Sequence, residues 1–358
     1  MLIESAIPSS SFQIKFIKYI QWLLDSGSYT STYKFALLMS LVDVAIESGI
    51  QDDSEYFVSY EYLAEHFIKL YWNQVLPYNS QQVSDSVILS QIGKGRRTVI
   101  VTAIAELQTK QTNLNLIKAK YHEAYLKLVK KVSNVIKNNP ALYLQSPESN
   151  NQTFLYQYDK TSKGIFLNSS IAYCLSYFSS IVYKLCQYYW TQYIRNNINN
   201  HHLFNNEQDL QQFLFGKTRQ TLSSLVPLFK DIQENQCFYC QKPLKDEFEV
   251  DHFIPWSKNH SDTSHNFVLA DPKCNNSKSD YLADVSFYEK WLARNQQFGF
   301  NIYDYCSDKG FVSNQDISER VSQWAYQMAI ENNDLVWTPP KKLEVISKLT
   351  NPNFELLT

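Results

Sequence analysis

The stretch CFYCQKPLKDEFEVDHFIPWS, residues 237–257, is the most informative part of this sequence about the fold of the C-terminal region. Cys237 and Cys240 are separated by two residues, the spacing with which short loops hold zinc. Asp251 and His252 follow, shortly before a proline, and combine an oxygen ligand with a side chain that can transfer protons. The stretch therefore predicts two sites close together, a cysteine site that supports the fold and a polar site that performs chemistry.

The segment HNFVLADPKCNNSKSD, residues 265–280, supplies the partners of both pairs. Asp271 and Cys274 repeat the two-residue gap, so that the two pairs together predict a tetrahedral zinc site with three sulfur ligands and one carboxylate. Asp271 stands where a fourth cysteine would be expected. His265 or a water molecule could take the fourth position instead, and a site without metal is a further alternative.

The order of these residues resembles that of the HNH endonucleases, the ββα-metal family of nucleases. The resemblance rests on VDHFIPWS (250–257), on the segment 265–280 and on the leading CFYC, and it covers about residues 236–285. In this family an Asp-His pair lies on the first strand, an Asn in the loop or second strand, and an Asn or His on the helix. The resemblance therefore implies a C-terminal ββα-metal (HNH) nuclease domain with a zinc knuckle and flanking helices.

The resemblance also implies a role for each matched residue. His252 would be the general base that activates a water molecule, a role that suits histidine because its side chain titrates near physiological pH. Asp251 and Asn275 would bind one Mg²⁺ or Mn²⁺ ion through oxygen atoms, and waters and the scissile phosphate would complete its shell. Asn266 would brace the loop and orient the histidine. Lys278, one helical turn after Asn275, could contact a phosphate oxygen or simply be solvated at the surface.

Residues 1–230 are predicted to form a mainly helical domain with a small β-hairpin. The chain has 25 Tyr and 21 Phe but only 8 Gly among its 358 residues, which favours a large helical core. Residues 12–24 and 31–48 show helical periodicity, and TFLYQYDKTSKGIFLN (153–168) has the two apolar runs and polar turn of a hairpin. We expect this domain to target, oligomerise or regulate the nuclease domain, residues 231–358, which includes the C-terminal helices.

Two further segments of the N-terminal region carry predictions. The apolar stretch from about Ser170 to Arg195 contains a lysine and several Ser and Tyr, so a buried core helix is expected rather than a membrane span. The next segment, NNINNHHLFNNEQDLQQ (196–212), has no periodicity and is expected to be a surface connector. His201 and His202 in it have no cysteine or carboxylate partner at ligand spacing, so they are not expected to bind metal.

Charge, cysteine usage and the first residues limit the functional classes. The net charge is −2, so any phosphate binding must come from local clusters or a bound metal. The first residues, MLIESAIPSSSFQ, show no basic region before an apolar core and therefore no secretory signal. Six cysteines, of which only three lie near other potential ligands, fit a reduced cytoplasmic protein with one metal site.

These observations together predict a metal-dependent HNH endonuclease that hydrolyses DNA phosphodiester bonds. Its cofactors would be Mg²⁺ or Mn²⁺ for catalysis and Zn²⁺ for structure. The family resemblance suggests a bacterial restriction or anti-phage defence context. DNA is the expected partner, the N-terminal domain could bind a partner protein or a second copy, and no membrane is involved. Two alternatives stay open: a catalytically inert zinc-binding regulatory module, and a nuclease that acts on RNA or single strands.

Overall fold

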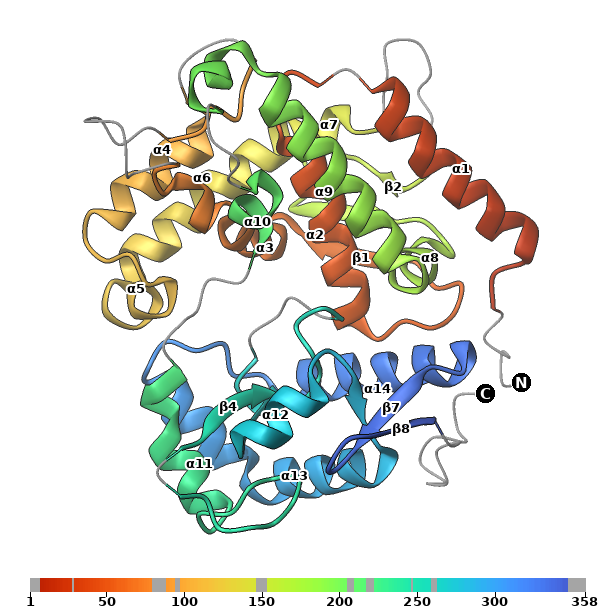
Figure 1. Cartoon of the computed structure of the whole chain (residues 1–358). Helices are drawn as coiled ribbons and strands as arrows, with labels where there is room; N and C mark the ends of the chain where they lie inside the picture. The colour runs from red at the N-terminus through yellow and green to blue at the C-terminus, as the bar shows by residue number, and fades with distance from the viewer. Residues whose placement is uncertain are drawn as a thin grey trace. The chain divides into compact units, whose positions relative to one another are not determined.

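The chain divides into two compact units, Met1–Arg219 and Gln220–Thr358 (Figure 1). The computed structural model describes residues 7–27, 29–78, 88–93, 97–145, 153–204, 209–216, 222–245, 247–258 and 263–346. The domain boundary expected at residue 230 lies inside helix α11 (Val226–Ile232), which packs against strand β5 (Phe267–Ala270) and helix α13 (Val285–Ser307) of the second unit.

The first unit is mostly helical, as expected. Its described helices are α1 (Ser10–Ser26), α2 (Tyr33–Ser48), α3 (Tyr60–Trp72), α4 (Val99–Gln108), α5 (Leu114–Lys120), α6 (His122–Asn138), α7 (Pro140–Tyr143), α8 (Ile171–Tyr177), α9 (Ser179–Asn196) and α10 (Leu210–Phe215), with 3₁₀ turns η1 (Asn73–Val75) and η2 (Ile198–Leu203). All residues of α2 except Lys34 and Ser48 are buried. A helix that is buried all round needs neighbours on every side, and α2 packs against α3, α8 and α9 (Figure 1).

The predicted hairpin is confirmed and belongs to a three-stranded sheet. Strands β2 (Tyr156–Gln157) and β3 (Gly164–Leu167) pair antiparallel. Strand β1 (Tyr56–Ser59) pairs with the other edge of β3, so that the strand order is β1-β3-β2. A Cβ atom at Gly164 would lie 2.2 Å from the carbonyl oxygen of Val58, so only glycine permits this close pairing.

The single core helix expected from about Ser170 to Arg195 is instead two helices, α8 and α9. The break lies at Phe178, whose ψ of 17° leaves the helical range. Its ring stacks on that of Phe16 in α1, with 6.1 Å between centroids. Helical periodicity extends across this position, so the prediction of one helix was wrong. No helix in the described part of the chain is long and apolar enough to cross a membrane.

The segment 196–212 is not simply a surface connector, because it contains two buried asparagines, Asn200 within η2 and Asn197 at its N-cap. The Asn200 side chain accepts a hydrogen bond from Ser90 N at 2.7 Å and donates one to Ser90 O at 3.0 Å. The Asn197 amide donates to Ile92 O at 2.9 Å. A carboxamide can both donate and accept hydrogen bonds, so these side chains bind backbone groups of the segment 88–93 as a neighbouring strand would.

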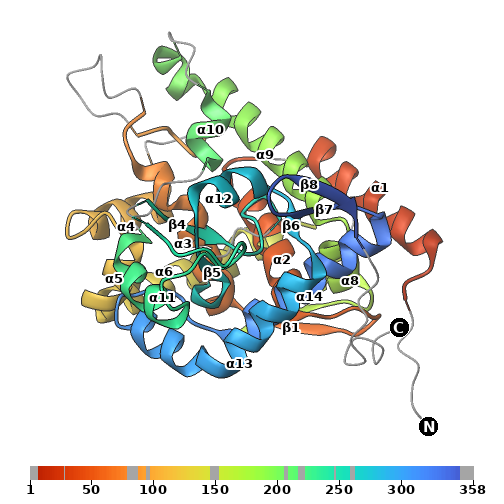
Figure 2. The same cartoon turned by 60° about the horizontal axis from the view of Figure 1, so that its bottom comes forward.

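The second unit contains the predicted ββα arrangement, which confirms the expected fold class. Strand β4 (Glu249–His252) pairs antiparallel with β5, and Asp251 lies opposite Val268. Helix α12 (Pro272–Lys278) follows β5 directly and packs on β4. Figure 2 shows the two strands side by side with α12 next to them.

Flanking elements complete the core of the second unit. They are η3 (Leu222–Leu225), η4 (Ser264–Asn266), β6 (Leu282–Ala283), α13, α14 (Gln315–Asn332), β7 (Leu335–Thr338) and β8 (Lys342–Val345), with a second sheet of order β6-β7-β8. The rings of Phe253 and Trp291 stack at 5.3 Å, which joins the chain after β4 to α13. Buried Arg294 of α13 donates to the carbonyl oxygens of His265 and Phe267, and so holds the start of β5 in place.

Candidate metal and active site

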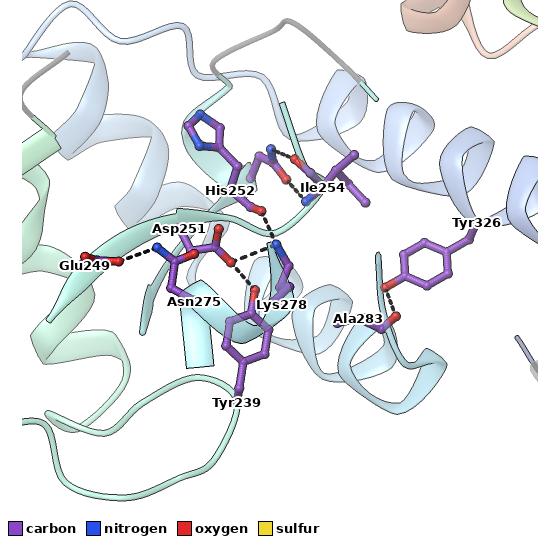
Figure 3. Close-up of polar contacts among 10 residues, drawn as sticks. Tyr239, Glu249, Asp251, His252, Ile254, Asn275, Lys278, Ala283 and Tyr326 are labelled. Carbon is purple, nitrogen blue, oxygen red and sulfur yellow. Dashed lines mark hydrogen bonds and ion pairs between the residues drawn. The ribbon is translucent and has the colours of Figure 1, made fainter. Parts of the chain in front are cut away.

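Strand β4 presents two carboxylates, Glu249 and Asp251, on one face, because alternate residues of a strand point to the same side. His252 is the last residue of β4, and its imidazole projects away from the Asp251 carboxylate (Figure 3). The imidazole is partly exposed and lies edge-on to the rings of Phe267 and Trp256, at 5.0 and 5.9 Å. The proposed base and the proposed cation ligand therefore face different directions.

Asp251 is held by two donors that both bind its Oδ2 atom. The Tyr239 hydroxyl donates to Oδ2 at 2.5 Å, and the Lys278 ammonium lies 3.0 Å from the same atom. Both partners come from outside β4, one from the cysteine loop and one from α12 (Figure 3). Oδ1 is consequently the oxygen through which Asp251 can ligate a cation.

Lys278 is not solvated at the surface, the alternative that the sequence left open. Its side chain has 0% exposure, whereas long charged side chains usually reach water. In addition to the Asp251 contact, its Nζ donates to His252 O at 3.0 Å. The ammonium is thus directed at the Asp-His pair, because a buried charge requires a counter-charge and hydrogen-bond acceptors.

Asn275 of α12 lies on the carboxylate side of β4, and its amide points to Glu249 (Figure 3). The Asn275 Nδ2 atom donates to Glu249 Oε2 at 2.6 Å, an assignment that follows because a carboxylate only accepts. The carbonyl Oδ1 of Asn275 remains for a cation. Glu249 was missed by the sequence reasoning, although its position two residues before Asp251 on a strand could have indicated it. Together these oxygen atoms form a hard donor set that suits Mg²⁺ or Mn²⁺.

Asn266 clamps the backbone immediately after the histidine. Its side-chain Oδ1 accepts from Ile254 N at 2.7 Å, and its Nδ2 donates to Ile254 O at 3.0 Å. Its own carbonyl accepts from Phe253 N at 2.8 Å. These three bonds favour the bracing role that the resemblance implies for Asn266, because they tie the residues after His252 to η4.

The cysteine site is brought together from the loop before β4 and from α12. The sulfur atoms of Cys237, Cys240 and Cys274 all lie within 4.8 Å of one another, close enough to share one metal ion. Burial and the neighbouring sulfurs raise the pKa of the Cys237 and Cys274 thiols. A bound divalent cation reverses this effect, since it ligates the thiolate form. Three sulfur ligands on a short-spaced framework fit zinc.

Asp271 is not part of this cluster, although the spacing suggested it as the fourth ligand. Its carboxylate caps α12, where Oδ1 accepts from Lys273 N at 2.8 Å. Only its backbone N–H contacts the cluster, through a bond to Cys237 Sγ at 3.3 Å. The alternative ligand, His265, is buried in η4 and bonded to Gly299 O at 3.1 Å. Within the described residues the site therefore has three protein ligands, and water or another external ligand would complete it.

The comparison with family models defines the class of the second unit. The model of the HNH endonucleases matches residues 237–281, a range that contains every predicted site residue. The chain carries an HNH endonuclease domain, so the resemblance is confirmed; such a domain supports a nuclease-type function and implies nucleic-acid binding.

The comparison also places the chain in a family defined by its first unit. The chain belongs to the family described as Domain of unknown function (DUF8808), whose model matches residues 14–214. No curated protein and no solved structure matches the chain.

Proposed function

We propose that the protein is a metal-dependent endonuclease that hydrolyses phosphodiester bonds of DNA. The observation that carries this proposal is the hydrogen bond from Asn275, on the helix of the ββα unit, to Glu249, which lies on the same face of the first strand as Asp251 (Figure 3). His252 ends the same strand. An inert zinc module would need the cysteine cluster but would have no use for this set of oxygen donors.

The chain's own residues divide the chemical tasks. Asp251 and Asn275 would hold the divalent cation, and Glu249 would orient the Asn275 amide for this purpose. The bound ion supplies Lewis-acid stabilisation of the charge that develops on the phosphate. His252 accepts the proton of the attacking water at a ring nitrogen. Because its imidazole points away from Asp251, the base and the cation ligands can serve different sides of the scissile phosphorus.

The test of this mechanism is a cleavage assay on plasmid DNA with Mg²⁺ or Mn²⁺. Loss of a general base should lower the rate of the His252→Ala variant by about 10²–10⁴. The matched control is His201→Ala, which removes an exposed histidine of the first unit and should leave the rate unchanged. Full activity of His252→Ala would refute the assigned role.

The substrate class is tested by offering duplex DNA, single-stranded DNA and RNA under the same metal condition. Preferential cutting of the duplex supports the proposal, whereas preference for RNA or single strands supports the corresponding alternative. Absence of cleavage of all three substrates with both metals would favour the inert regulatory module.

The biological setting that we propose is restriction or anti-phage defence in a bacterial cytoplasm, and it rests on the family resemblance of the sequence. We assign residues 1–230 to targeting, regulation or self-association, with DNA or a second copy of the chain as partner. Expression of the chain in a sensitive host should lower phage plating efficiency, and His252→Ala should restore it. Equal plating with and without the chain would contradict a defence role, and gel filtration of the full chain tests self-association.

A further inference from the structure

Tyr239 connects the cysteine cluster to the proposed cation site. It lies between Cys237 and Cys240 in the loop that carries two of the three sulfur ligands. Its side chain is 3% exposed, and its hydroxyl reaches Asp251 Oδ2 at 2.5 Å (Figure 3). One short loop therefore supplies two of the metal ligands of the cluster and also donates a hydrogen bond to the Asp251 carboxylate.

The surroundings of Tyr239 fix the direction of this hydrogen bond. Its ring packs edge-on against Trp337 at 5.2 Å and against Phe287 at 5.6 Å. A carboxylate only accepts hydrogen bonds, so the Tyr239 hydroxyl is the donor in its 2.5 Å contact with Oδ2. A protonated donor in a packed pocket holds the carboxylate in one rotation.

The cluster is also adjacent to Asn275, the second proposed cation ligand. Cys274 directly precedes Asn275 on α12, and the backbone N–H that opens this helix, from Asp271, donates to Cys237 Sγ at 3.3 Å. A metal shared by the three sulfurs therefore fixes the start of α12 together with the loop that carries Tyr239. Both proposed cation ligands depend on the same cluster for their positions.

We propose that Tyr239 is a positioning residue through which metal binding at the cysteine cluster strengthens divalent cation binding at Asp251 and Asn275. The inference rests on the proposed function of that site. With the cluster closed, Tyr239 and Lys278 together hold Oδ2, and Oδ1 is presented to the cation. With the cluster open, the loop releases the hydroxyl, and Asp251 keeps only the ammonium, which competes with a cation for the carboxylate.

Tyr239 does not bind the cation itself but donates a hydrogen bond to a proposed cation ligand, Asp251, and this position sets the expected size of the effect. Loss of a hydrogen-bond partner of a metal ligand weakens metal binding by roughly 10–100-fold. Two linked sites influence each other equally, so Mn²⁺ should also increase the affinity of the cluster for zinc.

The first experiment is a calorimetric titration of Mn²⁺ into zinc-loaded full-length protein. We expect Tyr239→Phe to retain one equivalent of zinc but to bind Mn²⁺ roughly 10–100-fold more weakly than the wild type. The matched control is Tyr326→Phe, which removes a buried hydroxyl of the same unit whose bond, at 2.8 Å, goes to Ala283 O (Figure 3). This control should bind Mn²⁺ like the wild type. Equal Mn²⁺ affinity of Tyr239→Phe and the wild type would overturn the inference.

The second experiment separates coupling from a general loss of stability. Zinc is removed from the wild type and from Tyr239→Phe, circular dichroism verifies that the helices persist, and Mn²⁺ is titrated again. Zinc removal should weaken Mn²⁺ binding strongly in the wild type and much less in Tyr239→Phe, because the link is already cut. An equal loss in both proteins would show that the coupling does not pass through Tyr239.

The outcomes also distinguish this inference from the proposed function. A wild type that neither binds Mn²⁺ nor cleaves nucleic acid overturns the function and the inference together. A wild type that does both, while Tyr239→Phe binds Mn²⁺ with the same affinity, overturns only the inference.

Discussion

Substitution of Lys278 by methionine tests whether this lysine belongs to the buried core of the site or to a substrate-facing surface. The Lys278 ammonium lies 3.0 Å from Asp251 Oδ2, and the two side chains are 0% and 9% exposed. Lys278→Met leaves the carboxylate buried without its counter-charge, and removal of one partner of a buried pair costs about 3–5 kcal/mol. For a unit of this size 1 kcal/mol shifts the Tm by about 3–5 °C, so we expect a fall of roughly 10–25 °C.

The assay is scanning calorimetry of zinc-loaded protein without other divalent cations. Lys273→Met is the matched control, because Lys273 lies on the same helix but is exposed, and surface substitutions change stability by within about 0.5 kcal/mol. A double variant with Asp251→Asn leaves neither charge buried and should recover about 1–3 kcal/mol relative to the sum of the single effects. If Lys278→Met were as stable as Lys273→Met, the ammonium would be in water and the phosphate-contact hypothesis would regain its support.

Two other predictions concern the zinc ligands and the core of the first unit. Asp271→Asn should keep zinc and its stability, since Asn also caps helices. Asp271→Ala should keep zinc, but its free energy of unfolding should fall by about 1 kcal/mol. Loss of zinc from both variants, measured by atomic absorption, would identify Asp271 as a zinc ligand. In the first unit, His66 is buried between Asp43 at 3.6 Å and Glu47 at 3.3 Å. Burial alone would lower the pKa of His66, but the Glu47 charge and the bonds to both carboxylates outweigh it and raise the pKa from 6.5 to about 10. The stabilisation of the folded state by protonated His66 is complete below pH 6.5 and is lost as the pH rises through 10. The thermal midpoint of the first unit should therefore fall between pH 6 and pH 10 in the wild type but not in His66→Gln, and a midpoint that rises over this range would contradict the assignment.

The parts of the protein that depend on short residue spacings could be predicted from the sequence. The Cys-x-x-Cys loop, the Asp-His pair and the asparagines that follow in order predicted the ββα unit through their resemblance to the HNH endonucleases, and the spacing of the cysteines predicted a zinc site. The helices α1 and α2 and the hairpin β2–β3 followed from periodicity.

The packing of the elements against one another determines which of these side chains are in contact. Asp271 was expected to bind zinc by its spacing, but it is the N-cap residue that precedes α12, and its carboxylate accepts a hydrogen bond from the backbone N–H of Lys273. The site brings together a loop residue, a strand residue and a helix residue, namely Tyr239, Asp251 and Lys278. Neither the burial of Lys278 nor its ion pair with Asp251 therefore produces a periodic pattern in the sequence. Contacts between distant segments depend on how the elements pack around a shared core, and that packing set the environment of the Asp251 carboxylate.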